Sequence, residues 1–111
     1  MNRDELIAIF RKWFSATAPL WVSIVTEAVS ASFNCHISAL SLSAVELSGL
    51  LEVGSESTIF SVVSLAHAAQ FSTAALTGED AVKFSFGISL VMSTGEKVRF
   101  LSYGQLSGEI N

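Results

Sequence analysis

The N-terminal segment carries its apolar side chains at a helical spacing. Five large ones share one stripe of an α-helix, at i, i+3, i+4, i+7 and i+8: Leu6, Ile9, Phe10, Trp13 and Phe14. Asn2 is a favoured N-cap residue, and Glu5 stands three positions later, as in a capping box. Pro19 disfavours a helical conformation in the residue before it. The pattern therefore predicts a helix over about residues 3–15.

After Pro19 the pattern changes to alternation with a period of two, which is typical of strands. It predicts strands over residues 20–29, 33–39, 45–48, 58–65, 83–92 and 97–103. Turns are expected at residues 30–32, 41–44, 52–57, 77–80 and 93–96. Gly95 suits the positive φ that a tight hairpin requires. Residues 66–75 lack a clean period, and their alanines favour a short helix or a loop.

The predicted order of elements is one helix followed by short antiparallel strands with short connections. Neighbouring strands joined in this way pair as a meander. We therefore expect a mainly β (α+β) fold in which the N-terminal helix precedes a five- to six-stranded, strongly bent antiparallel sheet or small barrel. Residues 1–111 form a single domain in this prediction, with the helix at 3–15, the barrel at 20–103 and a loose tail at 104–111.

A helix followed by a small, strongly bent antiparallel barrel, from about Asp4 to Tyr103, resembles the Sm-like fold and small bacterial proteins of helix-plus-barrel type. The resemblance is one of topology. The turns 41–44 and 93–96 read SLSA and STGE, whereas Sm proteins have Asp and Asn near the first and Arg-Gly or Lys-Gly near the second. No RNA-contacting residue is carried over. The resemblance implies assembly of copies through strand edges.

Charge is sparse in this chain. Charged residues make up 14% of it, and six basic against ten acidic residues give a net charge of −4. Nucleic-acid affinity depends on neutralising phosphates, so this balance disfavours RNA as a partner. Lys83, Lys97 and Arg99 form the one predicted basic patch, because two of them lie on a predicted hairpin and the third begins it. An exposed hairpin commonly carries such charges simply to prevent aggregation.

The candidate chemistry is limited. Cys35 is the only cysteine, shares its strand face with Phe33 and Ile37, and is interpreted as a core thiol. A lone thiol fits a reducing compartment, so we expect a cytoplasmic protein. His36 points to the opposite face, and a site that combines it with His67 is a minor alternative. No metal-binding, phosphate-binding or nucleophile motif appears, so we expect no cofactor, no metal and no enzymatic activity.

Residues 57–78 contain no Asp, Glu, Lys or Arg, and they are long enough to span a bilayer. Frequent Ser and Thr, together with His67 and Gln70, make insertion poor. The N-terminal sequence is interrupted by charges, which is not typical of a secretory signal. We therefore expect a buried strand and its connection in this stretch, and no membrane partner.

Several apolar side chains fall on strand faces that should contact solvent: Trp21, Val25, Val91, Leu101 and Tyr103. Left exposed, they would form an apolar patch of the kind that marks an interaction surface. The sequence thus predicts a non-catalytic small-barrel module that forms a homo-oligomer and binds a protein partner. The alternatives are an Sm-like RNA-binding protein and a small ligand-binding barrel or enzyme that uses His36 and His67.

Overall fold

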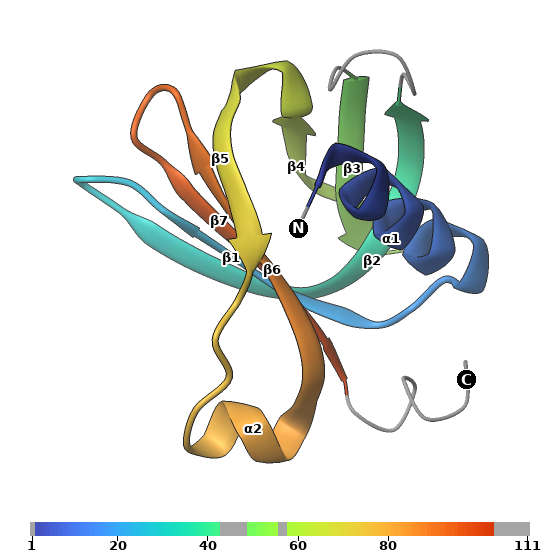
Figure 1. Ribbon diagram of the computed structural model, residues 1–111, viewed down its shortest axis with the longest axis vertical. Helices are drawn as coiled ribbons and strands as arrows, with labels where there is room; N and C mark the ends of the chain where they lie inside the picture. Colours follow the sequence, from blue (N-terminus) through green and yellow to red (C-terminus); the bar gives the residue numbers. More distant parts are fainter. Residues whose placement is uncertain (1, 43–48, 56–57, 104–111) are drawn as a thin grey trace.

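The computed structural model in Figure 1 describes residues 2–42, 49–55 and 58–103. Within these residues the chain forms two α-helices, one 3₁₀ turn and seven strands. Their bounds are α1 (Arg3–Ala16), β1 (Leu20–Val25), β2 (Ser30–Leu42), β3 (Gly49–Ser55), β4 (Thr58–Ser64), η1 (Leu65–His67), β5 (Ala68–Thr73), α2 (Glu79–Lys83), β6 (Phe84–Met92) and β7 (Lys97–Tyr103).

All seven strands belong to one antiparallel sheet in the order β4-β3-β2-β1-β7-β6-β5. The mainly β class and the N-terminal helix are thus confirmed. The described part of the chain has seven strands instead of five or six, and its sheet is open, because β4 and β5 have one strand neighbour each.

Helix α1 begins and ends close to the predicted positions. The backbone N–H of Glu5 donates to Asn2 Oδ1 at 2.8 Å, which satisfies one of the free N–H groups of the first turn. Thr17 adopts the left-handed conformation after the last turn, and its N–H donates to the carbonyl of Phe14. On the buried stripe, Phe10 makes an edge-to-face contact with Phe100 at 5.1 Å between ring centroids. This contact fixes the helix against β7.

The main hydrophobic core lies between α1 and one face of the bent sheet, called here the inner face. It is formed by alternate residues of the strands, such as Leu20 and Val22 of β1 and Ile88 and Leu90 of β6. The thirteen-residue strand β2 bends the sheet, since its first half pairs with β1 and its second half pairs with β3 (Figure 1). A register shift between Ile37 and Ala39 accompanies this change of partner.

Four local predictions are wrong. The first hairpin turns at residues 26–29 instead of 30–32, because the Thr26 hydroxyl both donates to the Val29 carbonyl and accepts from its N–H, each at 3.0 Å. Residues 66–75 contain strand β5, which pairs with β6 and aligns Phe71 with Leu90. The expected turn at 77–80 overlaps the short helix α2. Residues 52–55 of the expected turn at 52–57 belong to a strand instead, since β3 continues to Ser55.

A second, smaller core covers part of the opposite, outer face of the sheet. It consists of Ala74, Phe84 and Leu101, with Trp21, Leu76 and Tyr103 packed against it. The segment after β5 approaches the sheet closely here, since the N–H of Ala74 donates to the Gly87 carbonyl at 2.9 Å. A Cβ atom at Gly87 would lie 3.0 Å from the Cβ of Ala74 and would also meet the Leu101 side chain. The chain therefore covers this part of its own sheet.

Some sequence predictions concern residues that the structure does not describe. The strand at 45–48, parts of the turns at 41–44 and 52–57, and the tail at 104–111 lie outside the residues that the structure describes. In the part that it does describe, neither helix is long and apolar enough to cross a membrane. The uncharged stretch 57–78 holds β4, η1 and β5.

Candidate functional site

The two outermost strands of the sheet are consecutive in the chain. Strand β4 leads into β5 through the single 3₁₀ turn η1, so the two edges begin from the same point of the molecule without pairing (Figure 1). The tip of the β6–β7 hairpin is fixed beside this turn, because the N–H of Ser93 donates to the His67 carbonyl at 2.7 Å. A gap therefore remains between the free edge of β4 and the β6–β7 hairpin.

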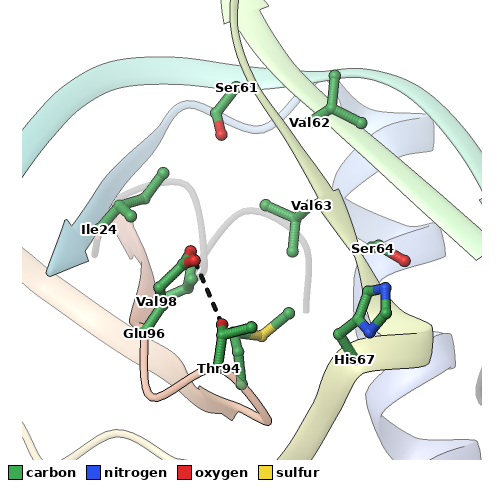
Figure 2. A pocket seen from close by; sticks show the side chains of 10 residues that line it. Ile24, Ser61, Val62, Val63, Ser64, His67, Thr94, Glu96 and Val98 are labelled. Atoms are coloured by element: carbon green, nitrogen blue, oxygen red, sulfur yellow. Dashed lines mark hydrogen bonds between the residues drawn. The ribbon is translucent and has the colours of Figure 1, made fainter. Parts of the chain in front are cut away.

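A cavity of about 270 Å³ lies along this gap, and we call it the β4 cavity (Figure 2). Strand β4, the turn η1, the β6–β7 hairpin and the end of β1 line it. Its lining residues are Ile24, Ser61, Val62, Val63, Ser64, His67, Met92, Thr94, Glu96 and Val98.

The lining shows which side of β4 meets the cavity. Ser61, Val62, Val63 and Ser64 are consecutive, and successive side chains of a strand point to opposite faces. All four can border one space only if that space runs along the edge of the strand. On its other edge β4 pairs with β3, so the cavity lies beside the unpaired edge. Backbone N–H and C=O groups of an unpaired edge are available to a further strand.

The floor of the β4 cavity is apolar and its rim is polar. Val63, Met92 and Val98 belong to the main core and are buried, and Figure 2 shows Val63 pointing toward the middle of the space. At the rim, the Thr94 hydroxyl donates to Glu96 Oε1 at 3.3 Å. His67 lies on the opposite side of the cavity from this pair (Figure 2). The arrangement can hold an apolar group below a polar one.

Strand β4 also exposes large apolar side chains. Ile59 is 56% exposed, Val62 is 53% exposed and Phe60 is 39% exposed. The ring of Phe60 stacks on Phe33 at 5.2 Å between centroids and 8° between planes. No Asp, Glu, Lys, Arg or Pro occurs between Thr58 and Ser64. Natural edge strands commonly carry such residues, which prevent unwanted pairing.

The residues predicted from the sequence as an interaction surface lie largely beneath the chain itself. Leu101 is fully buried in the second core, where Trp21 and Tyr103 are half-buried. The Tyr103 hydroxyl also donates to Asn34 Oδ1. Val25 is 41% exposed and Val91 is half-buried. The exposed patch that motivated the prediction is thus reduced, and the use of these five residues in binding stays a prediction.

Two residues of the predicted basic patch have acidic neighbours. Arg99 lies 3.9 Å from Asp80 and donates a hydrogen bond of 3.4 Å to the Ala75 carbonyl. Lys83 lies 3.9 Å from Glu79, both in helix α2. These contacts lower the positive potential that the patch would offer to a phosphate backbone. RNA binding by Lys83, Lys97 and Arg99 stays a prediction.

The cysteine and the histidines occupy different environments. Cys35 lies in the main core, as predicted, and burial raises the pKa of its thiol to about 11. His36 alternates with Cys35 and Ile37 on β2 and so faces the outer side of the sheet, whereas His67 borders the β4 cavity. The described residues contain no group of three or more His, Cys, Asp or Glu side chains that could hold a metal ion.

The residues that stand out in the structure were not singled out from the sequence. Ile59, Phe60 and Val62 were expected on a buried strand, and Glu96 was expected only in a turn. The available signal was the absence of charge from residue 58 to residue 64. A buried strand and an unprotected edge strand both lack charge, so this signal did not distinguish them.

Comparisons of the chain with protein-family models, with curated proteins and with solved structures found no match.

Proposed function

We propose that this protein is a non-catalytic interaction module that self-associates and binds a protein partner, and that β4 is the strand through which it does so. The observation that carries the proposal is an edge strand of seven residues without charge or proline, on which Ile59, Phe60 and Val62 are exposed. Such a strand offers both backbone hydrogen bonds and apolar surface to an added strand.

The other edge of the sheet is a weaker candidate. Strand β5 also lacks charge, but its exposed side chains are small or polar: Ala69, Gln70, Ser72 and Thr73. Pairing there would bury little apolar surface, and the free energy of association depends largely on that burial. The edge of β4 is therefore the preferred site of association.

A second copy of the chain fits the chemistry of β4. Two identical strands side by side bring charges of the same sign close together wherever the strand carries one. Because β4 has no charged residue, this repulsion does not arise. The predicted resemblance to the Sm-like fold points to the same kind of contact, since that resemblance implies assembly through strand edges.

Sedimentation velocity over a range of protein concentrations tests the proposal. We expect wild-type protein to show a concentration-dependent rise in sedimentation coefficient. Val62→Lys should weaken the association at least about tenfold, because an ammonium group buried in the contact loses its hydration. Val82→Lys is the matched control, since Val82 is 86% exposed on α2, and it should leave the association constant within about a factor of two.

Two results would refute the proposal. One is a wild-type protein that remains a monomer at every concentration and retains no partner. The other is an equal loss of association in Val62→Lys and Val82→Lys, which would indicate a general effect of charge. Circular dichroism on both variants shows whether they keep the wild-type fold.

A further inference from the structure

The β4 cavity has the form of a slot for one extended segment. One long wall is the unpaired edge of β4 from Ser61 to Ser64, and the opposite wall is the β6–β7 hairpin. A segment added to an edge strand forms main-chain hydrogen bonds on one side and places alternate side chains in pockets. The hairpin tip is held at η1, since the N–H of Ser93 donates to the His67 carbonyl. An extended peptide can therefore lie along this edge as an added strand.

The floor of the slot selects the side chain that points inward. Val63, Met92 and Val98 present aliphatic carbon and sulfur atoms and are buried, with exposed fractions of 7% or less. A polar side chain placed over them would lose its hydration without gaining a hydrogen bond. The inward position of the segment therefore favours an aliphatic side chain of moderate size, since the whole cavity measures about 270 Å³.

The rim selects the next side chain on the same face. Among the residues that the structure describes, Glu96 is the only acidic one that lines the cavity, and no lysine or arginine lines it. The Thr94 hydroxyl donates to its carboxylate and holds it at the rim. Lys97 and Arg99 alternate with Val98 and so belong to the outer face, where Arg99 contacts Asp80. The electrostatic character of the slot therefore favours a cation over an anion.

The spacing of these two groups matches an extended chain. Glu96 immediately precedes β7 and Val98 is the second residue of that strand, and both line the cavity. In an extended segment, residues i and i+2 share one face and lie about 6.6 Å apart. In such a segment, an aliphatic residue can therefore lie over Val98 on the floor while a basic residue two positions away reaches Glu96 at the rim.

We propose that the β4 cavity binds an extended segment of a partner protein in which an aliphatic residue and a lysine or arginine are separated by one residue. This inference rests on the proposed function, and it adds the chemistry of the partner. The aliphatic side chain lies over Val63 and Val98, the basic side chain pairs with Glu96, and the main chain pairs with Ser61–Ser64.

Titration of ¹⁵N-labelled protein with short peptides tests the inference. The probe is acetyl-Gly-Val-Ser-Lys-Gly-amide, and the matched control peptide has Glu in place of Lys. We expect the lysine peptide at millimolar concentration to shift the amide signals of Ser61–Ser64 and of the β6–β7 hairpin. The glutamate peptide should bind several times more weakly, because its carboxylate faces Glu96. A lysine peptide with N-methylvaline should also bind more weakly, since it lacks one main-chain donor.

Two substitutions in the protein complete the test. Glu96→Gln should weaken binding of the lysine peptide by up to about fivefold, the upper end of the range for exposed ion pairs. Glu79→Gln removes the same charge from α2, outside the cavity, and should leave binding unchanged. Dispersed amide spectra show that both variants are folded.

The inference is wrong if none of the peptides shifts the signals of Ser61–Ser64, or if the lysine and glutamate peptides bind equally well. Its failure is separable from that of the proposed function, because sedimentation on the same samples measures self-association. A protein that self-associates through β4 and ignores the peptides would overturn only the chemistry assigned to the slot. A protein that binds the lysine peptide and stays monomeric would overturn only self-association.

Discussion

Substitution of Leu101 tests whether the chain covers the outer face of its own sheet. Leu101 is fully buried in the second core against Ala74 and Phe84. Removing a fully buried leucine side chain to alanine costs about 2–5 kcal/mol of unfolding free energy. Trp21 and Tyr103 at the border are only half-buried and can relax into the space. We therefore expect Leu101→Ala to cost about 2–3.5 kcal/mol, in the lower part of that range.

Urea denaturation followed by circular dichroism measures this loss. Leu50→Ala deletes the same atoms from a side chain that is 50% exposed, and it should cost less than about 1 kcal/mol. Both variants and the wild type are compared at a low and a high protein concentration. The loss in Leu101→Ala should be the same at both, because residues of the same chain cover Leu101. A loss below about 0.5 kcal/mol, or one that appears only at high concentration, would refute this reasoning.

Two further predictions concern α1 and the core. Burial raises the pKa of the Cys35 thiol from 9.0 to about 11, so at pH 8 the thiolate fraction falls about 100-fold. Iodoacetamide should therefore react with the folded protein at least about 100-fold more slowly than with the urea-unfolded protein. Equal rates would contradict the burial of this thiol. The same shift means that the folded state loses stability as the pH rises from about 9 toward 11, which pH-dependent urea denaturation checks. Asn2→Ala removes the hydrogen bond to Glu5 and should cost about 1 kcal/mol in thermal or urea unfolding, whereas Asn2→Ser should recover most of it.

The elements predicted correctly are those whose side chains repeat with one strong period. The stripe from Leu6 to Phe14 gave the helix, because only a helix brings those positions together. The alternation from Phe84 to Met92 gave β6, and Gly95, with a φ of 94°, gave the turn that leads into β7. In both cases local sequence and tertiary packing favour the same conformation.

Other elements depend on contacts that the local pattern does not contain. The small residues of β5 have no clear period, and the strand forms through its pairing with β6. The position of the first turn follows from the hydrogen bonds of Thr26, whereas the serines at 30 and 32 begin the next strand. Strand β4 was predicted, but its edge position was not, because strand order follows from pairing between distant segments.

The low charge of the chain has two separate explanations in the structure. Around Leu101 few charges are needed, because the segment after β5 and Phe84 exclude water from the outer face. Along β4 no other described part of the chain pairs with the free edge, and Ile59 and Val62 stay more than half exposed. The two regions therefore respond differently to substitution. We expect a change at Leu101 to lower the stability of the folded chain. On the proposed function, a change at Val62 should weaken self-association and leave the chain folded. If substitution of Leu101 weakened self-association and substitution of Val62 did not, the second copy would contact the outer face that the sequence first indicated. Strand β4 would then have no part in the contact.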